Sequence, residues 1–229
     1  MTESDFSAVH VPLLQEVVLD QLRERLIDGT FPPGAHLNIS EIAEALGVSI
    51  VPVREAIKIL QSEGRLIRDR NRSYKVRQLT RDELVQMNQL SSYLEIELIR
   101  AGVPNLTDED VEQMRAMNET VAQLAGDRRE ILDAHRELHF ICYRAADKSV
   151  FLHYLQRLWD HYEHYRLLFF DSESPIESDA SVQHQEWVEA CARRDVEAAV
   201  EIHERHRANS FVYLSGIADE LGERAASNS

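Results

Sequence analysis

Cysteine is scarce in this sequence, and long apolar runs are absent. Cys142 and Cys191 are the only two cysteines among 229 residues. They are too few for a disulfide framework, and their separation does not match the spacing of zinc ligands. No apolar run approaches the roughly 20 residues that a membrane-spanning helix needs, and the polar start MTESDFS is unlike a signal peptide. We therefore expect a cytoplasmic protein in a reducing compartment, with no membrane partner.

Positive charge is also in short supply, and it is unevenly distributed. The chain has 25 Lys and Arg against 40 Asp and Glu, a net charge of −15, and a uniformly acidic surface repels nucleic acid. Residues 1–78, however, hold 10 cations and 11 anions, whereas 79–229 hold 15 and 29. Residues 54–77 alone hold eight cations and three anions. We therefore predict two domains with different partners, 1–78 and 79–229.

The first domain has the helix and turn signals of a winged helix-turn-helix. A helical pattern over 13–28 is followed by a turn, and Asn38 with Glu41 predicts a capping box for a short helix. Ser49 is a candidate cap for the next helix, in which Pro52 takes the third position, where a missing N–H loses no intrahelical bond. Two short strand-like segments then flank the turn-rich RNRS. Helix, short helix, tight turn, helix and basic hairpin is the order of a winged helix-turn-helix.

The helix after Ser49 is the candidate reader of a DNA groove. Its apolar residues repeat at helical spacing and predict a buried stripe of Val53, Ala56, Ile57 and Leu60. The same spacing leaves Arg54 on the free side, together with Ile50, Val51 and Lys58. Val51 has no hydrogen-bond donor for a base and could pack only on a thymine methyl. The alternative is a small helical domain whose basic hairpin is a solvated face.

The second domain is helical almost to the end of the chain. It shows no strand alternation, so we predict a mainly α protein whose C-terminal domain is an antiparallel all-helical bundle. The expected helices are, to within a few residues, 80–100, 107–124, 128–147, 149–170, 178–193 and 195–221.

Histidines are concentrated in this second domain. In AHRELHF, His135 and His139 are four residues apart, so on a helix they share one face and can share a metal ion. Glu137 points away from them, which excludes the zinc-protease arrangement. On the last helix, either His203 or His206 would face inward, depending on the helix phase.

Spacing alone leaves three interpretations of these histidines open. They could be polar residues of structural importance only, or ligands of a regulatory metal. A metal with an open position could also activate water, which would make the protein a metal-dependent enzyme with an appended nucleic-acid-binding module. No general base and no nucleophile motif such as GxSxG accompanies the histidines, so we expect no enzymatic activity.

The segment from Leu22 to Val76 resembles the DNA-binding domain of the GntR family of bacterial transcription regulators. GTFPPGAHLNISEIAEALGVS, PVREAIKILQSEG and RNRSYKV carry the resemblance. It implies operator contacts from the recognition helix and the wing, at Ser49, Arg54, Asn71 and Arg72. Val51 and Arg70 lie beside these residues and complete the candidate set. Family members commonly have Arg-Thr where this chain has Ile50-Val51, so we do not expect the commonest operator sequence of the family.

The sequences DAHRELHFICYRAADKSVFLHYLQRLW and QHQEWVEACARRDVEAAVEIHERH resemble the FCD effector domain of the FadR subgroup. Metal sites in that domain use an Asp, a His four residues later and two further histidines. The resemblance implies a set in which imidazole replaces the carboxylate: His135, His139, His184 and His206. It also implies a divalent transition metal, with zinc or nickel preferred, a small carboxylate effector, and a homodimer on near-palindromic operator DNA. Ser91 stands where the family often has an arginine.

Overall fold

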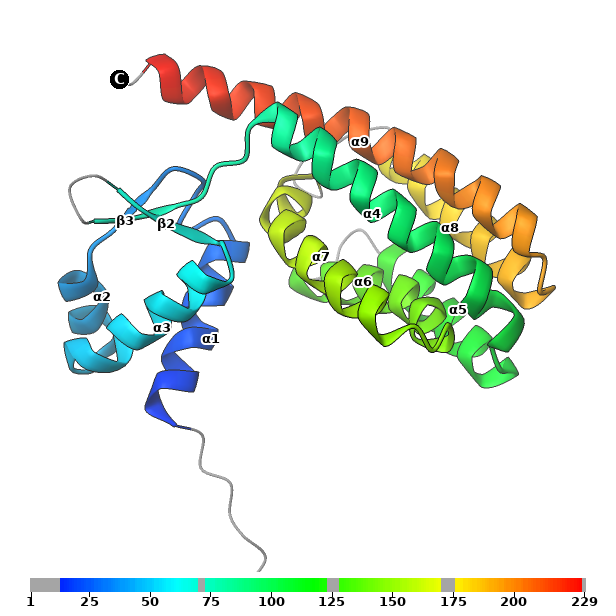
Figure 1. The fold of residues 1–229 in the computed structure, drawn as a ribbon, viewed down its shortest axis with the longest axis horizontal. Coiled ribbons are helices and arrows are strands. Elements are labelled where there is room, and N and C mark those ends of the chain that lie inside the picture. The colour runs from blue at the N-terminus through cyan, green and yellow to red at the C-terminus, as the bar shows by residue number, and fades with distance from the viewer. Residues whose placement is uncertain (1–12, 70–72, 123–127, 170–175, 228–229) are drawn as a thin grey trace, which may run out of the picture. The chain divides into compact units, whose positions relative to one another are not determined.

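A computed structural model of the chain describes residues 13–69, 73–122, 128–169 and 176–227. The chain divides into two compact units, Met1–Arg77 and Gln78–Ser229. The predicted mainly α fold is confirmed, because helices make up most of the described residues in both units (Figure 1). Within the described ranges, no helix is both long enough and apolar enough to cross a membrane.

In its described residues, the first unit has three helices and a small sheet. Its elements in chain order are α1 Leu14–Ile27, β1 His36–Leu37, α2 Ile39–Leu46, α3 Ile50–Ser62, β2 Leu66–Arg68 and β3 Tyr74–Val76. The strands pair antiparallel in the order β1-β3-β2. α1 and α2 both pack on α3, and Leu22, Ile57 and Leu60 are almost completely buried between them. The helix order matches the predicted winged helix-turn-helix.

Local signals place the ends of these helices. Asn38 accepts a hydrogen bond from Ser40 N at 3.0 Å and donates one to Glu41 at 2.8 Å, so it caps α2, although the full capping box is not formed. Gly47 ends α2 in the left-handed conformation, with φ of 65°, which glycine adopts without steric cost. Ser49 is the N-cap residue of α3, but its side chain makes no capping hydrogen bond.

β1 was missed by the sequence analysis, which expected only a turn there. Its two residues are too few to show an alternating pattern. They form a strand because they pair with β3, with His36 opposite Lys75 and Leu37 opposite Tyr74. Edge pairing of this kind depends on tertiary structure and leaves no local signal.

The second unit is a helical bundle. Its elements are α4 Arg81–Gly102, the short 3-10 helix η1 Val103–Asn105, α5 Asp108–Ala122, α6 Arg128–Ala145, α7 Ser149–Phe169, α8 Ile176–Ala192 and α9 Val196–Ser227. α4 and α9 lie side by side along the bundle (Figure 1). α6 packs on α4, α5 and α7, and α8 packs on α5 and α9. All six predicted helices are present, and α9 extends about two turns beyond the expected end at 221.

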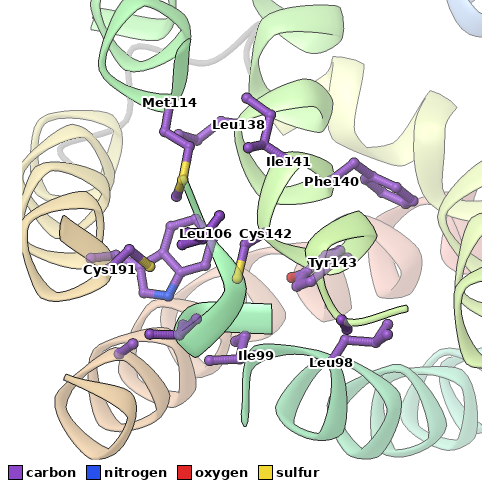
Figure 2. Close-up of a cluster of buried hydrophobic side chains, with 14 of the residues drawn as sticks. Leu98, Ile99, Leu106, Met114, Leu138, Phe140, Ile141, Cys142, Tyr143 and Cys191 are labelled. Atoms are coloured by element: carbon purple, nitrogen blue, oxygen red, sulfur yellow. The ribbon is translucent and has the colours of Figure 1, made fainter. Parts of the chain in front are cut away.

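The bundle core is a single apolar cluster that contains both cysteines (Figure 2). Trp187, Leu138 and Met114 are almost completely buried in it. Cys142 and Cys191 are free and buried. The hydrogen bond with Cys191 and burial both raise the pKa of the Cys142 thiol. It is therefore protonated at neutral pH and packs as a small apolar side chain.

One glycine sets how closely two helices of this core approach. A Cβ atom added to Gly102 at the end of α4 would lie 2.2 Å from the carbonyl oxygen of Cys142 on α6. Backbone atoms cannot move aside as the end of a flexible side chain can. Gly102 therefore allows a contact between α4 and α6 that no larger residue permits.

We expect Gly102→Ala to lower the free energy of unfolding of this unit by about 2 kcal/mol or more, because the new methyl group overpacks a backbone contact. Gly216→Ala is the matched control, since nothing lies within 4 Å of its added Cβ in α9, and it should raise stability by up to about 1 kcal/mol. Urea unfolding followed by tryptophan fluorescence measures both, because Trp159 and Trp187 are the only tryptophans of the chain. Equal stabilities for the two variants would contradict the close contact.

Candidate metal centre and nucleic-acid interface

α3 presents one apolar face to its unit and a different face to solvent. Val53, Ala56, Ile57 and Leu60 are completely buried, as the helical spacing predicts. Ser49, Val51 and Arg54 are exposed, and Val51 is 65% exposed. An exposed face with a hydroxyl, an apolar group and a guanidinium can contact both bases and phosphates in a major groove.

The two cations of α3 differ in their surroundings. Lys58 is paired with Glu55 at 2.6 Å, whereas no hydrogen bond or ion pair joins Arg54 to the other described residues. Arg54 is therefore available to an external anion without first breaking an internal pair. The predicted wing residues Arg70, Asn71 and Arg72 lie outside the described residues. The strands that flank them, β2 and β3, have the predicted antiparallel pairing.

Four predicted histidines come together inside the second unit. His135 and His139 extend from α6, His184 from α8 and His206 from α9. Each offers one ring nitrogen, and these four atoms lie within 4.8 Å of one another. All four side chains are buried. The Nε2 atoms of His184 and His206 are only 3.2 Å apart.

This donor set fits a divalent transition metal. Zinc–nitrogen bonds of about 2.0–2.1 Å in a tetrahedron separate the nitrogens by about 3.3 Å, so the four rings need move only slightly to converge on one ion. Burial and the neighbouring His135, His184, His203 and His206 all lower the pKa of His139 well below its ordinary value of 6.5. The neutral imidazole that results is the form that binds metals.

Two tryptophans hold the histidine rings in place. The Trp159 ring stacks on His135, with centroids 5.8 Å apart, and Trp187 lies against His139 at 4.9 Å. Both tryptophans are buried. Ring orientation in a metal site depends on such outer contacts, because the ligand nitrogens must point at one position.

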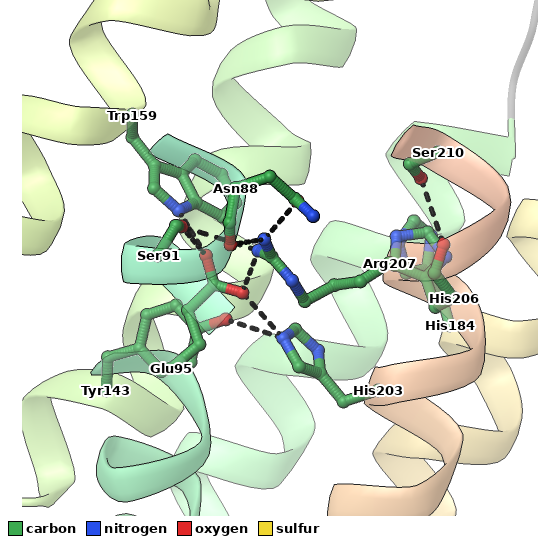
Figure 3. Close-up of polar contacts among 10 residues, drawn as sticks. All are labelled: Asn88, Ser91, Glu95, Tyr143, Trp159, His184, His203, His206, Arg207 and Ser210. Carbon is green, nitrogen blue, oxygen red and sulfur yellow. Dashed lines mark hydrogen bonds and ion pairs between the residues drawn. The ribbon is translucent and has the colours of Figure 1, made fainter. Parts of the chain in front are cut away.

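A buried carboxylate lies beside the histidine cluster and was not predicted. Glu95 on α4 is completely buried. Its Oε1 accepts from Ser91 Oγ at 2.7 Å and from Trp159 Nε1 at 2.8 Å. Its Oε2 lies 2.7 Å from His203 Nε2 and 2.5 Å from the guanidinium of Arg207 (Figure 3). We call these five residues the Glu95 network.

The Glu95 carboxylate is ionised. Burial raises its pKa. The charge of Arg207 and the hydrogen bonds from His203 and Ser91 together lower the pKa by more than burial raises it, so the pKa lies well below its ordinary value of 4.5. The guanidinium of Arg207 also donates to the side-chain and backbone oxygens of Asn88. Ser91, the residue that replaces the arginine common in the family, is thus a member of this network.

The sequence contains a pattern that predicts this network, although the sequence analysis did not consider it. Ser91 and Glu95 are four residues apart and lie between apolar core positions of α4, so two polar side chains share its buried face. Buried polar groups need partners, and such a pair predicts a network. For α9, the structure buries His203 as well as His206, where the sequence analysis expected only one of them to face inward.

Comparison with known proteins identifies the chain. Residues 86–209 match the family model of the FCD domain, and residues 14–76 match that of the bacterial regulatory proteins of the gntR family. The chain belongs to the GntR family and carries an FCD domain. The HTH-type transcriptional regulator McbR of Escherichia coli (strain K12) is 30% identical over 152 residues, which are 66% of this chain and 68% of that protein.

Further relatives agree with this assignment. The probable D-xylose utilization operon transcriptional repressor of Paenarthrobacter nicotinovorans is 30% identical over 92% of this chain and 93% of its own length. The solved structure of E. coli McbR/YncC has the same fold, with a TM-score of 0.76 at 24% identity over 89% of this chain and 98% of that one. This GntR protein is therefore a transcription regulator with an effector-binding domain, and the alternative of a metal-dependent enzyme is wrong.

The lowered pKa of His139 predicts how the metal-free regulator responds to acid. Below pH 6.5 an unfolded histidine takes up a proton that folded His139 does not. Stability should therefore fall as the pH drops below this value, by up to about 1.4 kcal/mol per pH unit for one proton. Glu95 does not contribute to this loss of stability between pH 6.5 and 5, because the stabilisation from its carboxylate is lost only below its ordinary pKa of 4.5.

Urea unfolding of chelator-treated protein between pH 7.5 and 5 measures this slope. His139→Gln should reduce the slope by about one proton, and His153→Gln, at an exposed position of α7, should leave it unchanged. A slope that is the same in wild type and His139→Gln would show that His139 titrates normally.

Proposed function

We propose that this regulator binds operator DNA through α3 and the β2–β3 hairpin, and that a small carboxylate bound at a divalent metal modulates this binding. The convergence of four buried imidazoles from three helices, with donor atoms within 4.8 Å of one another, carries the proposal. The FCD domain supports assignment to the FadR subgroup. The alternative that the histidines are only structural would leave several imidazoles packed together without a shared cation.

The donor set favours zinc or nickel. Neutral imidazole nitrogens suit zinc, copper, iron and nickel, whereas magnesium, calcium and manganese prefer oxygen. The ligands would be His135, His139, His184 and His206, and the ion would supply a fixed positive charge inside the bundle. Four imidazole nitrogens are a ligand set that zinc accepts.

The charge balance of the site favours an anionic effector. A divalent ion with four neutral ligands keeps its full charge, and a buried charge is costly without a counter-charge. Glu95 is the only buried carboxylate among the described side chains, and its charge is already matched by Arg207. A small carboxylate from outside would supply the missing negative charge.

The Glu95 network gives the effector a route to the DNA-binding unit. His206 and Arg207 are neighbours on α9, and Arg207 pairs with Glu95 on α4. α4 begins at Arg81, only a few residues after β3 ends at Val76. An effector that prefers one arrangement of α4 and α9 would shift the population of regulator able to bind DNA.

On DNA, the exposed face of α3 would enter the major groove. Ser49, Arg54 and the hairpin residues Arg70, Asn71 and Arg72 would contact phosphates or base edges, and Val51 would pack on a thymine methyl. The alternative of a basic hairpin that is only a solvated face predicts no such contacts.

Arg54→Ala should weaken operator binding about tenfold and reduce the slope of log affinity against log salt by up to about one unit. The reason is that Arg54 has no ion pair with the other described residues, so its charge is available to a DNA phosphate or base. Fluorescence anisotropy measures this with a duplex that the wild-type protein selects from genomic fragments. Arg193→Ala, an equal charge change at an exposed position in the effector domain, should have little effect. Unchanged affinity in Arg54→Ala would refute the proposed role of α3.

We further propose that the regulator is a homodimer that pairs through an apolar patch on α4 and α7. The patch contains four exposed apolar residues that are 51–63% exposed, together with a partly buried phenylalanine: Leu90, Tyr93, Val150, Phe151 and Tyr154. Tyr93 and Phe151 are in ring contact, with centroids 6.3 Å apart. A second copy is the expected occupant, because a near-palindromic operator requires two recognition helices related by a two-fold axis.

Tyr93→Asp should convert the dimer into a monomer at micromolar concentration, because a charge would be buried at the centre of an apolar interface. Sedimentation equilibrium measures the association. Tyr154→Asp should act in the same direction, whereas Val212→Asp, which alters an exposed apolar residue of α9 (69% exposed), should leave the mass unchanged. A wild-type monomer, or a Tyr93→Asp dimer, would exclude this interface.

A further inference from the structure

The first turn of α3 presents two neighbouring apolar side chains to solvent. Ile50 is 42% exposed and Val51 is 65% exposed. Val48 and Ile59 are partly buried and pack against the core of the unit, whereas Ile50 and Val51 belong neither to that core nor to the side chains packed on it. These two side chains are therefore available to a partner that binds α3.

The shape of this apolar pair is fixed before any partner binds. Ile50 and Val51 both branch at Cβ, and such side chains have one strongly preferred rotamer in a helix. Pro52 follows directly, and its ring fixes the backbone φ angle at the next position. Because little conformational freedom remains to be lost, contacts with this pair cost little entropy.

The pair lies on the same face of α3 as its free cation. Ile50 and Arg54 are four residues apart and so stack on one side of the helix, with Val51 next to them. Arg54 is exposed, whereas Lys58 on the next turn is paired with Glu55 at 2.6 Å. In a helix-turn-helix, the N-terminal residues of the recognition helix contact base edges. The bases would therefore meet an apolar pair followed by one guanidinium.

One apolar group stands out on the base edges of the major groove, the C5 methyl of thymine. The other edge groups that distinguish the bases are hydrogen-bond donors and acceptors. These lose water without gaining a partner when they face Ile50 or Val51, and that loss is unfavourable. Consecutive residues of a helix project about 100° apart, so the two side chains can contact methyl groups on neighbouring base pairs.

We propose that Ile50 and Val51 together read C5 methyl groups, and that this selects operator half-sites with neighbouring thymines. The inference rests on the proposed function, in which α3 enters the major groove, and adds the chemical group that sets the base preference. A rise of about 1.5 Å per residue places Arg54 about 6 Å beyond Ile50. The thymines should therefore lie within about two base-pair steps, of roughly 3.4 Å each, of the Arg54 contact. A reader of the methyl group also accepts 5-methylcytosine, which carries its methyl on the same carbon.

Single methyl groups removed from the DNA test the proposal. Full-length protein first selects duplexes from a randomised pool, and synthetic copies of a selected duplex then carry uracil in place of one thymine of a half-site. Uracil lacks only the methyl group. At the two thymines read by the pair, binding should weaken about fourfold, as expected for one apolar carbon returned to water. Cytosine paired with guanine at the same position should bind more weakly than 5-methylcytosine by a similar factor. Fluorescence anisotropy measures each affinity.

Variants assign the preference to the pair. Ile50→Ala and Val51→Ala should each reduce the thymine-to-uracil ratio of affinities at one position to nearly one. Val17→Ala makes the same change at an exposed position of α1 (43% exposed) and should keep the full ratio at both. Arg54→Ala should weaken the thymine and uracil duplexes by the same factor. All four side chains are exposed, so we expect the variants to fold.

The outcomes separate this inference from the proposed function. A pool from which no duplex is selected, or Arg54→Ala with unchanged affinity, would overturn the proposed role of α3 and this inference with it. Selected half-sites without thymine, equal binding of every thymine and uracil duplex, or a ratio that the double variant of Ile50→Ala and Val51→Ala retains would overturn only the reading of methyl groups.

Discussion

The effector domain depends on how it neutralises one buried charge, that of Glu95. Placing a carboxylate in an apolar core is very costly unless each lone pair finds a partner. Here Ser91 and Trp159 satisfy one oxygen, and His203 and Arg207 satisfy the other. Removing the guanidinium alone would leave an uncompensated charge, at a cost of about 3–5 kcal/mol. The network therefore ties α4, α7 and α9 together in a single arrangement.

The same network links the histidine cluster to the rest of the bundle. Trp159 donates to Glu95 and stacks on His135, so one side chain serves both groups. His203 donates to Glu95 and contacts the His139 ring. A ligand that moves the Trp159 or His203 ring would also displace α4, because hydrogen bonds join both rings to Glu95 on that helix. Coupling in such a system requires only that the ligand prefers one of two arrangements.

Much of this could be predicted from the sequence, because local signals determine it. Asn38 and Gly47 mark the ends of α2, and the apolar stripe of α3 is set by helical periodicity. The spacing of His135 and His139 places them on one face. His184 and His206 came from the family resemblance, since spacing within one helix cannot reveal which helices are neighbours.

The features that were missed depend on tertiary structure. β1 exists only through pairing with β3. The burial of His203 together with His206 follows from α9 packing against both α4 and α8, which widens its buried face. Arg207 follows His206 directly, and the sequence alone does not show that its long side chain reaches Asn88 and Glu95. Such reach is a property of packed helices and not of any one segment.

The central claim, that four imidazoles from three helices bind one divalent ion, is tested most directly by X-ray absorption at the zinc edge of the zinc-loaded protein. The account predicts about four nitrogen ligands at about 2.0–2.1 Å, with the outer-shell scattering of histidine rings. A shell dominated by oxygen or sulfur, or one with fewer than three imidazoles, would contradict it.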